Sequence, residues 1–355
     1  MKVDLLDYTY PEELIARVPQ RPPRVMLVDQ GTPREVSFTD LLAGIPAGDV
    51  LVINDTRVNL RRVFALSGEE ILFLQELGGA KGGAEGGTDD DANLGQRWEV
   101  LFPARRFPLG AQLTLPGGIT MSLVAKGRPQ VVELSAAIHA EYFEKYGELP
   151  LPPYIQKSRA QRHNYREDQS WYQTAWAHRP GSFAAPTASL HFALEDLARL
   201  RARGVGVVHL TLHVGLGTFL PVRVEDLADH PMHAEDIEIP VETLEVIQTA
   251  KARGKKIWAL GTTVTRALEA WAQGHLVPRA DAAAYRGETR LLLQPGCTFQ
   301  VVDRLLTNFH QPRSTLLALV AAFSEIGTVQ RCYQWAIDRR FRLFSYGDLS
   351  VWLSK

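Results

Sequence analysis

The sequence changes character twice along its length, and these changes constrain the fold more than any other feature. Between residues 59 and 151, strand-like apolar runs such as 70–74 and 98–102 follow one another closely, and residues 111–134 continue in short β-rich pieces broken by glycines. Short, closely spaced strands with few helix signals are typical of a small barrel or sandwich. The sequence therefore predicts a β module in the middle of the chain.

A glycine-rich segment interrupts this module between its strand-like runs. Residues 78–95 read GGAKGGAEGGTDDDANLG and have no periodic apolar face. Such a composition offers almost no apolar surface to offset the conformational entropy lost on ordering. We expect this segment to be an enlarged, flexible hairpin connection at the surface.

Helix and strand signals alternate on both sides of the module. An apolar strand at 50–53 precedes it, and the elements predicted after it are a helix at 194–200, a strand at 205–214, a helix at 242–252, a strand at 256–260 and a helix at 261–271. Ser314 is placed to cap a further helix over 315–323, since its hydroxyl can accept a bond from a free backbone N–H. Alternation of this kind predicts layered α/β structure.

The expected fold class is therefore α/β, with a discontinuous layered α/β main domain and an inserted small β-barrel domain. The main domain is expected to comprise residues 1–58 and 152–355, and the inserted domain residues 59–151. The proline-rich residues 148–154 are predicted to form a linker that is too rigid for a helix.

Composition excludes several classes of protein. The two cysteines, Cys297 and Cys332, are too few for a disulfide framework or a cysteine zinc site, which fits a reducing compartment. No apolar run approaches the roughly 18 residues that a membrane helix needs, and the acidic start of the chain does not have the form of a secretory signal. We expect a cytoplasmic protein that does not associate with a membrane.

The net charge of −1 conceals local basic clusters. One cluster lies directly after the proline-rich residues and comprises Lys157, Arg159, Arg162, His163 and Arg166; another comprises Arg339, Arg340 and Arg342. Clustered cations can bind phosphate even on a nearly neutral protein. A solvated charged face is the alternative interpretation of each cluster.

Polar motifs stand where predicted strands end or helices begin, which is where open α/β sheets bind ligands. These motifs are Asn54 to Arg57, Ala184 to Phe192, His213 to Phe219, Gly261 to Arg266, and Thr307 to His310. Their carboxylate, amide, imidazole and backbone N–H groups can hold a sugar, an anion or a base. Taken alone, each motif is equally well explained by a turn or a helix cap.

The segment His230 to Glu235 raises the question of a metal, because two histidines have His-x-x-His spacing and a glutamate follows. It lacks the His-Glu-x-x-His signature of a metal-binding helix, Pro231 separates the histidines, and no cysteine partner is near in the sequence. We predict no metal site.

In combination and order, these motifs closely resemble the S-adenosylmethionine:tRNA ribosyltransferase-isomerase family of queuosine biosynthesis. The resemblance runs along nearly the whole chain, through Asn54 to Val58 (NDTRV), Tyr146 to Ile155 (YGELPLPPYI), Tyr172 to Thr174 (YQT), Ala184 to Ala188 (AAPTA), Leu190 to Phe192 (LHF), His213 to Gly215 (HVG), Gly217 to Phe219 (GTF), Met232 to Glu235 (MHAE), Gly261 to Thr263 (GTT), Leu306 to His310 (LTNFH), Ser314 to Leu317 (STLL) and Phe344 to Asp348 (FSYGD). The departures are Ser189, where the family usually has glycine, the unusual residues 59–62, and the long glycine-rich insert.

The resemblance implies a specific reaction. The family transfers and isomerises the ribosyl part of S-adenosylmethionine onto 7-aminomethyl-7-deazaguanine at the tRNA wobble position, giving epoxyqueuosine and releasing adenine and methionine. S-adenosylmethionine is then a consumed substrate, and no cofactor or metal is implied. The implied partners are tRNA that carries the aminomethyl-deazaguanine precursor and S-adenosylmethionine itself. The family fold, an α/β domain interrupted by a β-barrel, agrees with the composition break, and we expect a monomer.

The implied chemistry needs acid–base groups, because the sulfonium acidifies the ribose C5′–H and adenine leaves poorly unless it is protonated or hydrogen-bonded. Histidine titrates in the right range, so the catalytic candidates are His213 and His233, followed by His191 and His310. Asp55 and Arg57 are candidates for orienting the ribose or the methionine carboxylate. The other substrate-binding candidates are Thr187, Gly215, Gly217, Glu235, Thr262, Thr263, Asn308, Tyr346 and Asp348, and the tRNA-binding candidates are Lys157, Arg159, Arg162 and Arg166.

Two other functions remain as alternatives. An S-adenosylmethionine-dependent RNA methyltransferase would have a glycine-rich turn after its first strand, a form that Asn54 to Arg57 does not have. A non-catalytic RNA-binding module would show stronger net basicity and would not need so many histidines in its loops.

Overall fold

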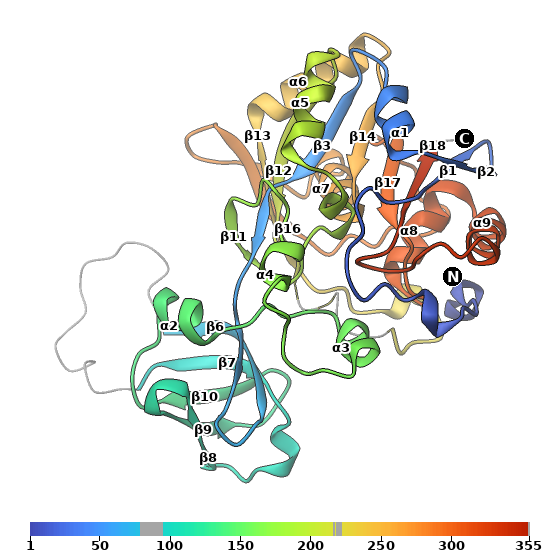
Figure 1. Ribbon diagram of the computed structural model, residues 1–355. Helices are drawn as coiled ribbons and strands as arrows, with labels where there is room; N and C mark the ends of the chain where they lie inside the picture. The colour runs from blue at the N-terminus through green and yellow to red at the C-terminus, as the bar shows by residue number, and fades with distance from the viewer. Residues whose placement is uncertain (79–94, 216, 218–221, 354–355) are drawn as a thin grey trace. The chain divides into compact units, whose positions relative to one another are not determined.

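The computed structural model describes residues 1–78, 95–215, 217 and 222–353. This part of the chain divides into two compact units, of which one comprises Met1–Val58 and Leu151–Lys355 and the other comprises Asn59–Pro150. A β-rich unit is thus inserted into a discontinuous α/β unit, and the predicted fold class is confirmed (Figure 1). The predicted flexible connection at 78–95 lies, apart from its end residues, outside the described residues. None of the described helices is long and apolar enough to cross a membrane.

A large mixed sheet forms the centre of the α/β unit. Its strands lie in the order β15 (Val277–Pro278), β16 (Ala284–Thr289), β13 (Glu235–Pro240), β12 (Gly206–Leu212), β3 (Val50–Asn54), β14 (Ile257–Leu260), β17 (Arg304–Asn308), β18 (Leu349–Leu353), β1 (Val25–Asp29) and β2 (Thr32–Val36). The neighbours β12, β3, β14 and β17 run parallel. Strand β13 runs antiparallel to β12, and β18 runs antiparallel to β17.

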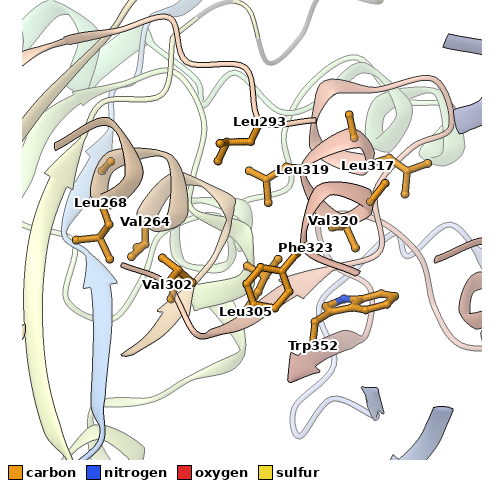
Figure 2. Packing of buried hydrophobic residues seen from close by; sticks show 14 of the residues in the cluster. Val264, Leu268, Leu293, Val302, Leu305, Leu317, Leu319, Val320, Phe323 and Trp352 are labelled. Atoms are coloured by element: carbon orange, nitrogen blue, oxygen red, sulfur yellow. The ribbon is translucent and has the colours of Figure 1, made fainter. Parts of the chain in front are cut away.

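Helices cover both faces of this sheet because alternate strand residues point to opposite sides. In β3, Val50 and Val52 join one apolar core, whereas Leu51 and Ile53 join the other. The first core packs against α6 (Val241–Ala252), α7 (Thr262–Ala272), α8 (Thr315–Ser324) and α9 (Ile326–Asp338), and Figure 2 shows part of it. The second core packs against α1 (Phe38–Gly44) and α5 (Leu194–Ala202).

Local signals placed most of these elements correctly. The Ser314 hydroxyl accepts a hydrogen bond from the backbone N–H of Leu317 at 3.2 Å, which confirms the predicted cap of α8. Helix α5 ends just before Gly204, whose φ of +81° suits a residue without a Cβ. The smaller helices are η1 (Val3–Leu6), η2 (Glu12–Leu14), α4 (Asp168–Trp171), η6 (Thr187–His191) and η8 (Leu227–Asp229).

The prediction that no helix forms within residues 148–154 is wrong for residues 153 and 154. Helix α3 (Pro153–Arg159) begins inside the proline-rich stretch. Proline has no N–H to donate, but the first helical position needs none, and the fixed φ of the ring suits a helix start. The prolines therefore start α3 instead of preventing it.

The inserted unit is a barrel-like sheet with its own apolar core. Its strands lie in the order β5 (Arg62–Phe64), β6 (Glu70–Leu77), β7 (Arg97–Leu101), β10 (Gln130–Leu134), β9 (Ile119–Ala125) and β8 (Gln112–Leu115). Strands β6 and β7 pair antiparallel, as predicted for the two arms of the glycine-rich connection. Phe73 and Trp98 pack on Phe143 of α2 (Ala140–Tyr146) within this unit, which also contains η4 (Ala104–Arg106) and η5 (Pro116–Gly118).

Candidate functional site

The parallel strands bring four of the sequence motifs to one edge of the large sheet. Because β3, β12, β14 and β17 run parallel, Asn54, His213, Gly261 and Asn308 all lie at or just beyond the carboxyl ends of these strands. Strand β13 runs the other way, so Glu235 at its start lies at the same edge. Ligands of open α/β sheets bind outside this edge.

A cavity of about 750 Å³ opens in the α/β unit and is lined by residues from these motifs. Nine of the residues singled out from the sequence line it: Lys157, Thr187, Gly217, His233, Glu235, Thr262, Thr263, Asn308 and His310. Its size and its mixed apolar and polar lining are typical of a small-molecule site. Helices α7 and α8 both begin at the cavity, with Thr262, Thr263 and Thr315 in its wall. Backbone N–H groups at helix starts favour an anionic group nearby.

A buried ion pair forms another part of the wall. Arg266 Nη1 donates to Glu235 Oε2, and Glu235 Oε1 accepts a hydrogen bond from the N–H of Gly215 at 3.2 Å. Arg266 Nε also donates to the carbonyl of Leu291, whereas its Nη2 has no hydrogen-bond partner among the described residues. Glu235 thus binds both Gly215 and Arg266, and the charge of the glutamate is balanced within the protein.

Aromatic side chains supply the apolar part of the lining. Tyr154, Tyr172 and Phe344 line the cavity, and the ring centroids of Tyr154 and Phe344 are 5.1 Å apart. The Tyr154 hydroxyl is hydrogen-bonded to Ser345 Oγ, and burial raises the pKa of Tyr154 to about 12. These rings therefore stay uncharged at neutral pH and offer π faces to a ligand.

Two of the four candidate histidines line the cavity. His310 Nε2 lies 2.7 Å from Thr307 Oγ1, and burial lowers the pKa of His310 to about 3, so its ring is neutral at physiological pH. His233 is exposed and packs against Gly217, where a Cβ would lie only 2.9 Å from its ring. His233 can therefore reach a ligand and solvent together.

The other two candidate histidines do not line this cavity. His191 is buried behind the wall, and its Nε2 lies 3.0 Å from Nδ2 of the lining residue Asn308. Burial, together with Arg21 and Arg342, lowers the pKa of His191 to about 3. His213 Nδ1 lies 2.8 Å from Thr56 Oγ1, and burial lowers the pKa of His213.

Asp55 and Arg57 lie with His213 beside the short parallel pair β4 (Thr56–Val58) and β11 (Arg179–Ser182). Asp55 is buried and accepts a hydrogen bond from Thr211 Oγ1 at 2.6 Å, while the Arg57 side chain is exposed. Neither residue lines the cavity. The structure therefore separates this group from the residues that the cavity brings together.

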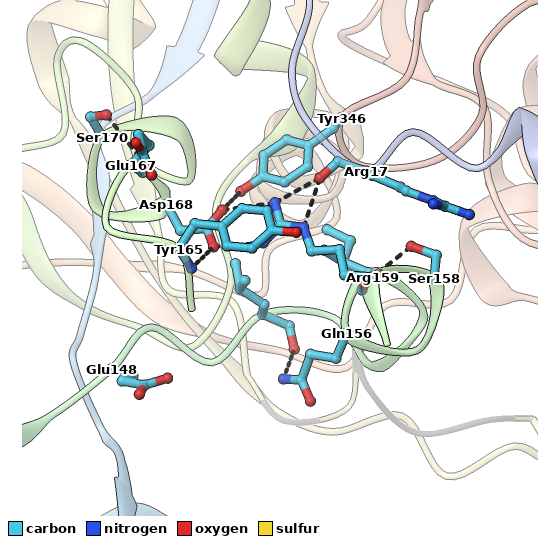
Figure 3. Close-up of polar contacts among 12 residues, drawn as sticks. Arg17, Glu148, Gln156, Ser158, Arg159, Tyr165, Glu167, Asp168, Ser170 and Tyr346 are labelled. Atoms are coloured by element: carbon cyan, nitrogen blue, oxygen red, sulfur yellow. Dashed lines mark hydrogen bonds and ion pairs between the residues drawn. The ribbon is translucent and has the colours of Figure 1, made fainter. Parts of the chain in front are cut away.

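Three further candidates have internal partners, and Figure 3 shows two of them, Arg159 and Tyr346. Arg159 forms a bidentate ion pair with Asp168 at 2.6 and 2.9 Å, and Tyr346 donates to the same carboxylate at 3.1 Å. The Arg159 side chain is only 2% exposed, and its guanidinium binds Asp168 inside the protein. The prediction that Arg159 contacts tRNA is therefore corrected. Asp348 accepts backbone N–H bonds from Arg24 and Arg342, which likewise assigns it a structural role.

Sequence reasoning did not select several lining residues as ligand contacts. Tyr154, Tyr172 and Phe344 lie inside motifs of the family resemblance, but the sequence analysis assigned them no role. Arg266 carried a clearer signal, since it stands within the mostly apolar run 264–271 and a buried arginine needs a partner. That partner, Glu235, lies 31 residues away in the sequence.

Comparison with known proteins agrees with this architecture. The family model described as queuosine biosynthesis protein matches residues 3–351. The chain is 42% identical over 375 residues to the S-adenosylmethionine:tRNA ribosyltransferase-isomerase of Sorangium cellulosum, covering 98% of this chain and 97% of the relative. It is 40% identical over 364 residues to the enzyme of the same name from Halothermothrix orenii, with 98% of each covered.

A solved structure has the same fold. The crystal structure of S-adenosylmethionine tRNA ribosyltransferase from Thermotoga maritima matches with a TM-score of 0.53 and 28% sequence identity, covering 98% of this chain and all of that one. Fold and cavity thus define an α/β protein with an inserted barrel-like unit and a cavity at the carboxyl edge of its large sheet. The chain belongs to the queuosine biosynthesis protein family.

Proposed function

We propose that this protein is an S-adenosylmethionine:tRNA ribosyltransferase-isomerase. It transfers and isomerises the ribosyl moiety of S-adenosylmethionine onto 7-aminomethyl-7-deazaguanine at the tRNA wobble position, giving epoxyqueuosine and releasing adenine and methionine. The observation that carries this proposal is the match of the whole chain to relatives of that name at about 40% identity. S-adenosylmethionine is consumed as a substrate without a further cofactor, and the protein acts as a cytoplasmic monomer.

The chemistry of the cavity suits these substrates. Aromatic faces attract a sulfonium cation, and the starts of α7 and α8 suit the methionine carboxylate. His233 supports the proposal as an exposed imidazole of the lining that can move the proton the reaction must remove, whereas the neighbouring His230 lines the same cavity and is less exposed. His310, which stays neutral, can hydrogen-bond a ligand without adding a positive charge beside the sulfonium.

One assay separates this function from its alternatives. The protein is incubated with S-adenosylmethionine labelled separately in the ribosyl and methyl groups, together with tRNA that carries the aminomethyl-deazaguanine. Free adenine and ribosyl label in the tRNA support the proposal. Methyl label in the tRNA would instead identify a methyltransferase, and binding without turnover would identify an RNA-binding module.

The basic stretch 157–166, which begins within the last turn of α3 and continues beyond it, is expected to contact tRNA phosphates. Lys157, Arg162 and Arg166 are exposed, and Lys157 also lines the cavity. Replacing all three by glutamine should weaken tRNA binding and reduce the slope of log Kd against log salt by up to about 2–3. Each phosphate contact releases condensed counterions on binding, and the variant makes fewer such contacts. The affinity for S-adenosylmethionine should change little.

Arg201 provides the matched control, since it is exposed on α5 and does not line the cavity. Arg201→Gln should leave the salt slope as it is. An unchanged slope in the triple variant would show that 157–166 is only a solvated charged face.

A further inference from the structure

The carboxamide of Asn308 is held from both ends. Thr187 Oγ1 donates to Asn308 Oδ1 at 2.8 Å, and Asn308 Nδ2 lies 3.0 Å from His191 Nε2. Because Nδ2 carries only donor hydrogens, it donates and His191 Nε2 accepts, which places the proton of the imidazole on Nδ1. With the proton on Nδ1, a flip of the amide would bring Oδ1 against the lone pair of Nε2. The orientation of the amide and this tautomer of the imidazole therefore support one another.

The state of His191 keeps this arrangement constant. His191 is buried beside Asn308, and its burial and the nearby Arg21 and Arg342 lower its pKa to about 3. A protonated ring would turn an N–H toward Nδ2, leaving two donors face to face. Because the ring stays neutral at physiological pH, one ring nitrogen remains an acceptor, and in the tautomer with the proton on Nδ1 that acceptor is Nε2.

Half of the hydrogen-bonding capacity of this amide remains open. A carboxamide has two N–H donors and two carbonyl lone pairs, and Thr187 and His191 use one of each. No other hydrogen bond of the Asn308 side chain is made within the part of the chain that the structure describes. Both Asn308 and Thr187 line the cavity. The amide thus has one donor and one acceptor left, in fixed positions.

We propose that Asn308 reads the edge of a purine-type base in the cavity, and that His191 and Thr187 are positioning residues that fix which atom of the amide donates. A fixed amide pairs with an edge that presents an acceptor beside an N–H donor, as asparagine does with adenine in nucleic acids. This inference rests on the proposed function, whose substrates contain two such bases. They are the adenine of S-adenosylmethionine and the deazaguanine of the tRNA.

The test compares ligands whose edges differ in donor and acceptor order. The first pair is S-adenosylmethionine and its inosyl analogue, in which the 6-amino group is replaced by oxygen and N1 gains a hydrogen. The second pair is tRNA that carries the aminomethyl-deazaguanine and the same tRNA with adenine at that position. Affinities are measured by calorimetry, so the test does not depend on turnover. The affinity ratios can therefore be interpreted even if the function assay shows no transfer.

The wild-type protein should prefer the matching member of one pair by at least about tenfold, the value of one or more well-made hydrogen bonds. In Thr187→Val and His191→Leu the preference should fall to about threefold or less, because the freed amide can turn to suit either edge. His191→Gln should keep most of the preference, since its side-chain oxygen can still accept from Nδ2. A merely structural role of His191 would lower the stability of the fold without changing this ratio.

Thr243→Val is the matched control, because Thr243 is a buried threonine on α6 whose hydroxyl binds the carbonyl of His209 away from the cavity. It should leave both ratios unchanged. If Thr187→Val and His191→Leu lose the preference within the first pair, the base that Asn308 reads is adenine. If they lose the preference within the second pair, the base is the deazaguanine. Ratios in Thr187→Val that equal those of the wild type in both pairs would overturn the proposal, even if His191→Leu failed to fold.

Discussion

Asp168→Asn should lower the free energy of unfolding by about 3–5 kcal/mol, because it removes the charge that balances a buried guanidinium. Asp168 is fully buried and accepts hydrogen bonds from Arg159, from the N–H of Tyr165 and from the hydroxyl of Tyr346 (Figure 3). The Arg159 side chain is almost as deeply buried, so solvent has little access to replace the carboxylate. Chemical denaturation followed by circular dichroism measures the loss.

An exposed ion pair of the same unit provides the control for this prediction. Asp4 lies 2.8 Å from Arg313, and the two side chains are 82% and 48% exposed. Asp4→Asn should therefore cost less than about 1 kcal/mol. Replacing both partners, as in Arg159→Met with Asp168→Leu, should restore much of the stability lost in Asp168→Asn, because no uncompensated charge remains. A loss in Asp168→Asn no larger than that of the control would refute this account of the pair.

His233→Ala should lower turnover by about 10²–10⁴-fold, the usual effect of removing an acid–base group, while the fold and the binding of both substrates persist. His233 is an exposed side chain at the surface, so its removal leaves no buried cavity. The imidazole lines the cavity beside Gly217 and the buried Glu235. The measurement is adenine release under single-turnover conditions, with thermal unfolding to verify the fold.

His275→Ala is the control, since His275 is also an exposed imidazole but does not line the cavity. Its turnover should stay within about threefold of the wild type. His213→Ala tests the competing assignment. A large loss there together with near-normal turnover in His233→Ala would transfer the acid–base role to the group around Thr56 and Asp55.

Much of the fold was predictable because its signals are local. The periodicity of residues 194–200 and 242–252, the cap at Ser314 and the β-rich middle of the chain each report on their own neighbourhood in sequence. The proline-rich stretch led to a wrong prediction about α3, and the reason is also local. Proline opposes the interior of a helix and favours its first turn, and only the position of α3 decides which effect operates.

The composition of the site was less predictable, because it depends on which strand ends lie next to one another and on which polar side chains bind partners inside the protein. Nothing near Arg159 in the sequence shows that Asp168 and Tyr346 enclose it. His191 and His310 look alike as motif residues, yet one stands behind the wall and the other in it. Long-range pairing decides such differences, and a single sequence carries little information about it.

The position of β18 within the sheet has a consequence for the order in which the protein can be assembled during synthesis. Strand β18, formed by residues 349–353, lies between β17 and β1, so it joins β1 and β2 to the parallel core of the sheet. Until these residues have left the ribosome, β1 and β17 both present unpaired edges. The inserted unit, by contrast, has all of its strands within 59–150 and can fold while the rest of the chain is still being made. Strand β1 therefore cannot join the parallel core of the sheet until β18 has been made, and during that interval the unpaired edges of β1 and β17 are open to wrong pairing.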